Sequence, residues 1–234
     1  MAKPFGQKLE AKTFDCVGEK ANVAVLSRLS GNLPMVEAYR AVKSYNEENG
    51  ASARIIRPST VDALIANGHW QFFVGCNYFL TDALIAYDAP GKELGREIVF
   101  SLDGKRIVVP TGGFMGEPGI ALVAFGLSPD NFKEDGKDIV VSVPSMHALQ
   151  KFPQKNGWYR CGPVQLLPEG EEVKSLSDAE GEPVRYLWRA NGNGAFVGPI
   201  VRDIRMEGDC HGIIANYDAF HNFSVVVEVS EAKM

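Results

Sequence analysis

Residues 96–109 of this chain read REIVFSLDGKRIVV, in which two apolar runs flank the dipeptide Asp103-Gly104. A two-residue loop of this type requires positive φ at both positions, and its twist matches that of an antiparallel β-hairpin. The pattern predicts a hairpin in which Phe100 faces Ile107, Ile98 faces Val109 and Val99 faces Val108. Because both faces of this hairpin are largely apolar, we expect it to lie inside the protein, covered on each side.

The strand pattern continues through the C-terminal two thirds of the chain. Short apolar segments alternate there with loops rich in Gly, Pro, Asn and Asp, and they predict strands at 71–79, 120–127, 139–143, 158–167, 184–190, 200–205 and 223–229. In the last of these, Phe223, Val225, Val227 and Val229 share one face, because side chains alternate along a strand. Many short strands separated by turns are typical of a sandwich or a partly open barrel-like sheet.

Helices are predicted only near the beginning of the chain. Between Pro34 and Asn49, apolar residues recur at three- and four-residue steps, and Gly50 suits the left-handed position that ends a helix. After a short strand at 53–57, the tripeptide Pro58-Ser59-Thr60 offers a break and a hydroxyl cap for a helix over 61–67. The expected fold class is therefore α+β, strand-rich, with two or three helices in the N-terminal third.

The length of 234 residues suits a single domain over residues 1–234. A boundary near Pro90-Gly91 would instead separate an α/β portion, residues 1–90, from a strand-rich portion, residues 91–234. The pentapeptide Asp-Ala-Leu-Ile-Ala occurs at 62–66 and again at 82–86, but the flanking residues do not align. Since stacked repeats need at least about three copies, we interpret the recurrence as coincidence.

Composition and charge limit the classes of function. Hydrophobic residues make up 45% of the chain and charged residues 23%, as in an ordinary globular protein. The net charge of -5 argues against a broad cationic surface, so nucleic acid is not an expected partner. The N-terminus lacks the apolar core of a secretory signal, and no apolar run reaches the roughly 18 residues of a spanning helix. We expect a cytoplasmic protein without membrane association.

Residues 209–221 read DCHGIIANYDAFH and concentrate more reactive side chains than any other segment. His211, Asp218 and His221 are candidate ligands for a divalent metal, since imidazole and carboxylate suit zinc, manganese or iron. A metal held there would support a hydrolase or a lyase through an activated water. The spacing of the two histidines matches neither a helical nor a strand pair, so the alternative is a set of turn residues between two strands.

The four cysteines, at positions 16, 76, 161 and 210, are dispersed singly, which favours free, buried thiols over a zinc or redox pair. Cys76 or Cys210 could act as a nucleophile only beside a base such as histidine. Cys210 and His211 are neighbours, and neighbours on a strand point to opposite faces. Cys76 lies in an apolar segment with the pattern of a buried strand.

The glycine-rich loop 110–119 contains neither the lysine nor the following helix of a phosphate-binding loop, so no nucleotide site is predicted there. Its tip, Phe114 and Met115, is instead interpreted as a contact surface, with an ordinary connection as the alternative.

Two strands mix large aromatic residues with arginine. The residues concerned are Trp158, Tyr159, Arg160, Trp188 and Arg189, and residues 191–194, NGNG, predict a hairpin turn after the second strand. This mixture is enriched at protein interfaces and at surfaces that stack on bases or sugars. The alternative is an aromatic core with solvated arginines.

The sequence contains no Ser-His-Asp arrangement, paired metal-ligand spacing, dinucleotide fingerprint or phosphate-binding loop. We therefore predict a non-catalytic binding or structural/assembly module without a cofactor, which contacts a protein partner or copies of itself through loops on a β-rich scaffold. Two alternatives stay open: a metal-dependent hydrolase or lyase that uses residues 209–221, and carbohydrate or nucleic-acid binding through the Trp, Tyr and Arg strands.

Overall fold

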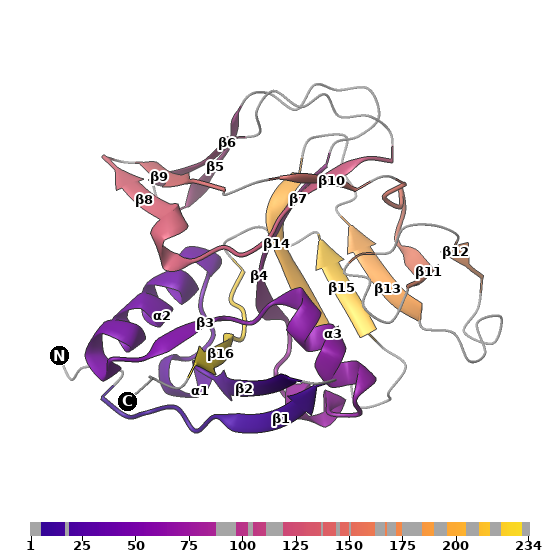
Figure 1. The fold of residues 1–234 in the computed structure, drawn as a ribbon. Helices are drawn as coiled ribbons and strands as arrows, with labels where there is room; N and C mark the ends of the chain where they lie inside the picture. Colours follow the sequence, from indigo (N-terminus) through magenta and orange to yellow (C-terminus); the bar gives the residue numbers. More distant parts are fainter. Residues whose placement is uncertain are drawn as a thin grey trace.

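The computed structural model describes residues 6–16, 19–87, 97–102, 105–110, 119–136, 138–143, 146–149, 151–161, 167, 172–174, 184–189, 196–204, 211–215 and 221–230. Of the strands at 97–110 and 211–215 it describes the backbone alone, except at Val108. Within these ranges the chain forms three sheets and three α-helices (Figure 1). The expected α+β class, rich in strands and with its helices near the N-terminus, is confirmed.

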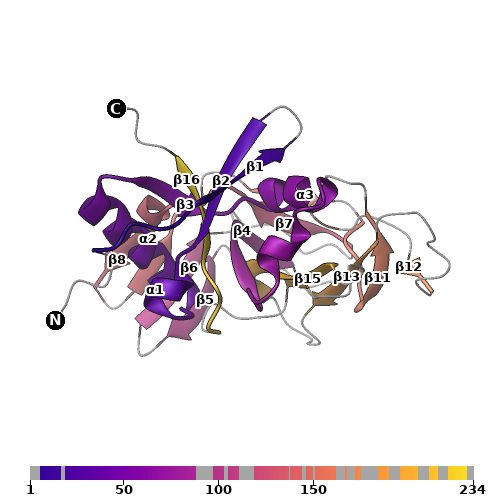
Figure 2. The ribbon, with the colours of Figure 1, turned by 90° about the horizontal axis from the view of Figure 1, so that it is seen from below.

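The first sheet joins the two ends of the described chain. Its strands are β1 (Lys12–Cys16), β2 (Glu19–Val25), β3 (Ser52–Ile55) and β16 (Val226–Ser230), in the order β1-β2-β16-β3, and all neighbours are antiparallel. A strand from the end of the chain is thus inserted between two from its beginning (Figure 2). As predicted, Phe223, Val225 and Val227 are buried together, and Val229 packs against them.

The second sheet contains eight strands in the order β10-β7-β4-β14-β15-β13-β11-β12. All neighbours are antiparallel except β13 and β15, which are parallel. The two longest strands, β4 and β14, pair with each other inside the sheet (Figure 1). The bounds are β4 (Phe79–Tyr87), β7 (Ala121–Ala124), β10 (His147–Leu149), β11 (Gly157–Arg160), β12 (Glu172–Val173), β13 (Val184–Arg189), β14 (Phe196–Ile204) and β15 (His211–Ala215).

The hairpin predicted at 96–109 forms half of the third sheet. β5 (Glu97–Leu102) pairs with β6 (Lys105–Pro110), and all three predicted pairs, including Phe100 with Ile107, are present. β9 (Asp138–Val141) lies beside β6, and β8 (Phe132–Asp135) lies beside β9. Val108, whose side chain is described, is buried. The strand pairing and the register predicted from Asp103-Gly104 are therefore confirmed.

Helix α2 (Met35–Asn49) forms where it was predicted, but Pro34, predicted as its first residue, is the N-cap instead. Pro34 directly precedes the helix, and Gly50 follows it with φ 58°, a left-handed conformation that glycine adopts without strain. Its apolar stripe, which includes Val36, Tyr39 and Val42, is buried in the same cluster as the β16 residues. The helix thereby packs into the core that the sheets share.

Two shorter helices flank α2 in the sequence, α1 (Ser27–Ser30) before it and α3 (Pro58–Ala66) after it. The hydroxyl cap predicted for α3 is wrong, because the helix begins earlier, with Arg57 at the N-cap and Pro58 as its first residue. Proline is tolerated there, since the N–H it lacks would have no partner within the helix. Thr60 lies inside the first turn, and its hydroxyl group has another partner.

The strand predicted at 71–79 is also wrong. Trp70–Phe73 forms the 3-10 helix η1, a turn follows, and β4 begins only at Phe79. Phe73 stacks on Phe79 with the ring centroids 4.9 Å apart, and Phe72 meets Phe73 edge-on. A dense aromatic run thus indicated burial but not an extended backbone. A second 3-10 helix, η2 (Pro129–Asn131), precedes β8.

The hairpin turn predicted at 191–194 lies outside the described residues, but the strands on either side of it are described. β13 and β14 do not form a hairpin, because β15 lies between them in the sheet. β14 pairs instead with β4, which offers it a longer apolar strand. Pairing between segments that are distant in the sequence therefore replaces the predicted pairing of β13 with β14.

The buried apolar residues that the structure describes form three clusters. The largest takes residues from α2 and from all three sheets, including Val141, Val201 and Val227. A second lies around β4, β7 and β14, and a third lies around α3, η1 and the strands next to them. Among the described residues, no helix is both long and apolar enough to cross a membrane.

Candidate functional site

A buried carboxylate, Glu228, organises a polar site on the first sheet. It lies in β16 with 9% of its surface exposed. Its Oε1 accepts hydrogen bonds from the Thr60 hydroxyl group at 2.6 Å, the Arg57 amide at 2.9 Å and Arg57 Nε at 3.1 Å. Its Oε2 accepts hydrogen bonds from Arg54 Nε at 3.0 Å and Nη2 at 2.7 Å, and Arg57 Nη2 lies 3.1 Å away. Each carboxylate oxygen of Glu228 thus has three nitrogen or hydroxyl donors around it.

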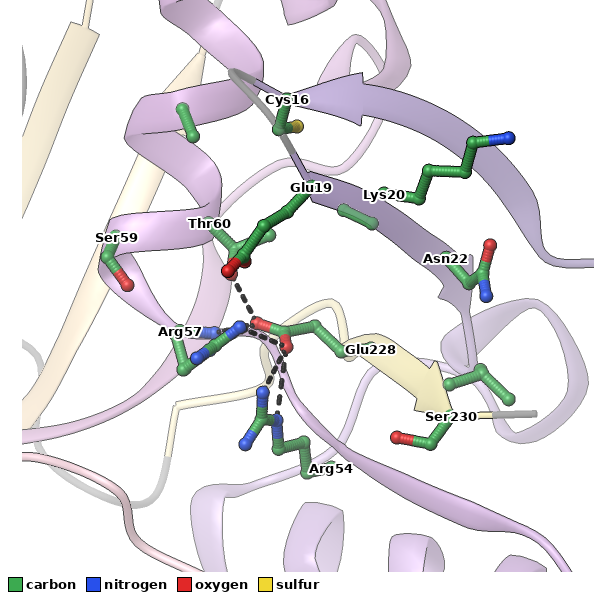
Figure 3. Close-up of a pocket in the computed structure, with 13 residues that line it drawn as sticks. Cys16, Glu19, Lys20, Asn22, Arg54, Arg57, Ser59, Thr60, Glu228 and Ser230 are labelled. Atoms are coloured by element: carbon green, nitrogen blue, oxygen red, sulfur yellow. Dashed lines mark hydrogen bonds and ion pairs between the residues drawn. The ribbon is translucent and has the colours of Figure 1, made fainter. Parts of the chain in front are cut away.

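Sheet register and the start of α3 bring these residues together. Glu228 pairs directly with Arg54 across β16 and β3. The chain then leaves β3, passes Arg57 at the N-cap and enters α3, so the Arg57 amide and the Thr60 hydroxyl group meet the same carboxylate. Figure 3 shows both guanidinium groups directed at Glu228. Glu228 supplies the acceptor that a capping side chain normally provides at a helix start.

Glu228 is held in its charged form. Burial alone would raise the pKa of its carboxyl group, but the hydrogen bonds from Thr60, Arg57 and Arg54 outweigh burial, so that the pKa lies below its usual value. Hydrogen bonds to a charged group are roughly twice as strong as neutral ones. The carboxylate therefore fixes the positions of both arginine side chains.

The two arginines border a pocket of about 430 Å³ between β2, the start of α3 and the end of β16 (Figure 3). The exposed fraction is 50% for the Arg54 side chain and 44% for that of Arg57. Their contacts with Glu228 use Nε and Nη2, which leaves Nη1 of each arginine outside these contacts. We call this the arginine pocket; its lining residues are Cys16, Glu19, Lys20, Ala21, Asn22, Arg54, Arg57, Ser59, Thr60, Ala63, Glu228, Val229 and Ser230.

The lining of the arginine pocket contains more cationic than anionic residues. Three residues are cationic, Lys20, Arg54 and Arg57, and two are anionic, Glu19 and Glu228. Because Glu228 is saturated by its own partners, it does not use the solvent-facing donors of the arginines. A guanidinium group carries five N–H donors in a planar fork, which matches the oxygens of a carboxylate or a phosphate.

A second buried carboxyl group, that of Asp82, interacts electrostatically with Glu228. Asp82 lies in β4, is 3% exposed and has an Oδ1 atom without a hydrogen-bond partner. Its pKa is raised from 3.8 to about 7, first by burial and then by the charge of Glu228, against the opposing effect of Arg54 and Arg57. Burial, and then the charge of Asp82, raises the pKa of Tyr39 in α2. Asp82 therefore titrates near neutral pH.

The described lining of the arginine pocket offers no activated nucleophile. Burial, followed by the charge of Asp15, raises the pKa of the Cys16 thiol, so it stays protonated at neutral pH. No histidine is among these lining residues to act as a base. The groups that the described lining does offer, two half-exposed guanidinium groups, have the charge and the donors to hold an anion.

The predicted metal ligands are only partly described. His211 is the first residue of β15, whose backbone alone is described, and Asp218 lies outside the described residues. His221 is exposed, with its ring 5.4 Å from that of Phe223 and 6.2 Å from that of Tyr78. Among the described side chains, no three His, Cys, Asp or Glu residues are grouped as metal ligands. The metal site at 209–221 stays a prediction.

Phe114, Met115 and Cys210 also lie outside the described residues. Cys76 is described, and it lies in the turn between η1 and β4 rather than in a strand. It is buried among the aromatic residues of that segment, and burial raises its pKa against the opposing charge of Arg28. These surroundings are those of a structural thiol.

The predicted aromatic and arginine residues are divided between two faces of the second sheet. Trp158 and Trp188 are half-buried, and both contact Tyr186, with ring centroids 5.2 and 4.3 Å from that of Tyr186. Tyr159 and Arg189 alternate with the tryptophans along their strands, so they point to the opposite face, and both are buried.

The buried guanidinium group of Arg189 has its partners within the protein. Its guanidinium carbon lies 4.6 Å from the centre of the Tyr87 ring, and Nη1 donates to the Pro153 carbonyl at 3.0 Å. Arg160, in contrast, is exposed. The five residues therefore do not form one continuous surface; the half-buried tryptophans and Tyr186 form an aromatic row by themselves.

The sequence interpretation did not identify Arg54, Arg57 or Glu228. One signal was available: Glu228 is the only charged residue in the apolar run 223–229, and a charge on a buried strand requires partners. The partners themselves could not be named, because Glu228 and Arg54 are 174 positions apart in the chain.

No protein-family model, curated protein or solved structure matches this chain. The function is therefore inferred from the arginine pocket itself.

Proposed function

We propose that the protein is a non-catalytic binding protein, which holds a small polar anion in the arginine pocket. The observation that carries this proposal is the pair of half-exposed guanidinium groups, Arg54 and Arg57, that share one buried carboxylate. Glu228 orients both side chains before a ligand arrives. Preorganisation of this kind lowers the entropic cost of binding, since long side chains need not be ordered by the ligand.

The size of the pocket and its neutral polar residues limit the ligand class. At about 430 Å³ the pocket lies within the range of small-molecule sites, roughly 300–1,000 Å³, and exceeds what a bare inorganic ion needs. Asn22, Ser59 and Ser230 line it and can hydrogen-bond the body of a polar ligand. The best-matching ligand is a small organic molecule with a carboxylate or phosphate group on the arginines and a hydroxylated body.

Calorimetric titration of the purified protein with a panel of small hydroxylated carboxylates and phosphates, and with sulfate, tests the proposal. We expect binding that weakens by roughly 10- to 100-fold in Arg54→Gln or Arg57→Gln, because each change removes hydrogen bonds to a charged group, worth about 1.5–3 kcal/mol. Glutamine keeps part of the side-chain stem, so the pocket wall is largely retained.

Arg40→Gln is the matched control for these variants. Arg40 is also a partly exposed arginine with two carboxylate partners, Glu37 and Glu134, but it lies on α2 outside the pocket. Thermal unfolding of each variant separates loss of binding from loss of the fold. Equal affinity in the pocket variants and in the Arg40 control would reject the site.

A further inference from the structure

On the basis of the binding function above, we propose that Asp82 couples anion binding in the arginine pocket to the uptake of a proton. In this mechanism the anion and the proton favour each other. The protein binds the anion more tightly while the Asp82 carboxyl group is neutral, and the bound anion in turn keeps that group neutral.

Backbone contacts hold Asp82 against the segment that carries the pocket arginines. The Asp82 amide donates to the carbonyl of Ile56 at 3.1 Å, and Ile56 directly precedes Arg57. On its other side, the Leu127 amide donates to the Asp82 carbonyl at 3.0 Å. The backbone of β4 at Asp82 is thus fixed to the connection between β3 and α3, next to the two arginines that border the pocket.

Charged and titratable groups act on Asp82 from each element around it. β16 contributes Glu228, β3 contributes Arg54, the start of α3 contributes Arg57, and α2 contributes the hydroxyl group of Tyr39. The second sheet is apolar beside it, with Pro199–Val201 of β14 on one side. On the other side lie Gly126 and Leu127, which follow β7. The pocket residues therefore dominate the electrostatic environment of this carboxyl group.

The contacts of Asp82 itself do not fix its charge state. Its Oδ1 atom has no hydrogen-bond partner and its side chain is buried, and a backbone hydrogen bond is only the last of the effects that lower its pKa. The ionised form therefore lacks the dense set of donors that stabilises Glu228. Glu228 favours the proton on Asp82, and the two arginines oppose it. A change in the charge of the pocket is thereby transmitted to this group.

A bound anion changes that balance. The bound anion offsets the positive charge of Arg54 and Arg57, and so weakens their stabilisation of ionised Asp82. Asp82 therefore takes up a proton when the anion binds. Because such coupling is reciprocal, affinity for the anion falls as the pH rises through about 7. We expect the fall to be about three- to tenfold, as for charges that interact through partly buried protein.

Sulfate is the probe for the test, because its own charge is constant over the relevant pH range. Its dissociation constant is measured by calorimetry between about pH 6 and about pH 8.5, on both sides of the change in Asp82. Titrations at neutral pH in two buffers of different ionisation enthalpy report the number of protons taken up. The expected result is proton uptake on binding and weaker binding at high pH.

Asp82→Asn keeps the shape of the side chain but cannot titrate. We expect this variant to bind sulfate with nearly the same affinity at both ends of the pH range, and without the proton uptake that depends on Asp82. Asp135→Asn is the control, since Asp135 is an exposed aspartate of β8 and the change should leave the pH dependence as in the unaltered protein. Thermal unfolding at both pH values verifies that each variant is folded.

Two failures are distinguishable. If sulfate binds, and Arg54→Gln weakens that binding, but pH dependence and proton uptake persist in Asp82→Asn, then the coupling is wrong and the binding function stands. If no panel anion binds in a way that depends on Arg54 or Arg57, the binding function fails and the coupling fails with it. The proton count of the unaltered protein is a second measurement, which does not depend on the folding of any variant.

Discussion

The two copies of Asp-Ala-Leu-Ile-Ala adopt different secondary structures. Residues 62–66 form the second half of α3, whereas residues 82–86 lie in the middle of β4. The first copy follows Pro58, which starts a helix, and precedes Gly68, whose φ of 78° turns the chain away. The second is paired on both sides, with β7 and with β14. Neighbouring chain, and not the pentapeptide, therefore decides the conformation.

Burial follows the conformation in each copy. The helix buries Asp62 and Leu64 but leaves Ala66 exposed, as expected for a helix with one face on the core. The strand buries all five residues, because Leu84 and Ala86 pack into one cluster and Ala83 and Ile85 into another. The apolar side chains of the pentapeptide thus pack into one hydrophobic cluster in α3 and into two in β4.

The two aspartates differ most in what surrounds them. Asp62 Oδ1 accepts from Arg202 Nη1 at 2.8 Å and lies 2.9 Å from Arg185 Nη2, so the carboxylate anchors α3 to the second sheet. Asp82 interacts with its arginines only through space, and its pKa is raised to about 7. A buried aspartate with direct ion pairs is a structural anchor, and one without them becomes a titrating group.

The largest expected effect in this comparison is that of Asp62→Asn. The change leaves two buried guanidinium groups without their carboxylate, so we expect the free energy of unfolding to fall by about 3–5 kcal/mol. Urea unfolding followed by circular dichroism measures it, with the exposed Asp135→Asn as the control. A loss below about 1 kcal/mol would mean that Asp62 is no anchor.

Asp82→Asn should have the opposite sign. Because the pKa of Asp82 is raised in the folded state, its contribution to stability is fully present below its unfolded pKa, 3.8, and is lost as the pH rises to about 7. The variant should therefore gain stability relative to the unaltered protein as the pH rises, by up to about 4 kcal/mol above pH 7.

Urea unfolding at a series of pH values tests this expectation. The difference between the variant and the unaltered protein should grow between about pH 4 and pH 7 and then stay constant. A difference that does not depend on pH would show that folding leaves the pKa of Asp82 unchanged, and would contradict this expectation.

A matched pair of alanine changes tests the difference in burial. Ala86→Val places two extra methyl groups in a strand residue that is 0% exposed, so we expect a loss of about 1–3 kcal/mol through overpacking. Ala66→Val, at the exposed end of α3, should change stability by no more than about 0.5 kcal/mol. Equal effects in urea unfolding would mean that the two copies are equally buried.

The smallest expected effect concerns the start of α3, which makes the first copy helical. Thr60→Val removes one of several hydrogen bonds to Glu228 and should cost about 1 kcal/mol. Ser59→Ala is the control, because Ser59 is exposed in the same turn. Amide hydrogen exchange across α3 measures both; faster exchange in Ser59→Ala than in Thr60→Val would contradict the role of Thr60.

Features that depend on neighbouring residues were predicted well from the sequence. The Asp103-Gly104 signal gave the register of β5 and β6, and the apolar stripe with Gly50 gave α2 and its end. The strand predicted at 71–79 failed because a short 3-10 helix buries aromatic side chains as effectively as a strand does. The predicted hairpin of β13 with β14 does not form, because β15 is inserted between the two strands.

The arginine pocket could not be predicted, because it depends on contacts between distant parts of the chain. Arg54 and Glu228 meet only through the pairing of β3 with β16, and no local pattern encodes that pairing. The predicted residues that are described, such as Trp188 and Arg189, were selected by chemical type, which does not determine the face of a strand on which a side chain lies. Alternation along β13 separates these two.

The insertion of β16 between β2 and β3 also governs when the first sheet can form during protein synthesis. β3 is made early, but its partner strand β16 is made late: Glu228 is added 174 residues after Arg54, with which it pairs. At roughly 5–20 residues per second, the ribosome needs on the order of 10–35 s to cover that distance. Until then β2 and β3 lack the strand that pairs with both, and Arg54 and Arg57 lack their carboxylate partner. The arginine pocket is therefore among the last parts of the molecule to be completed.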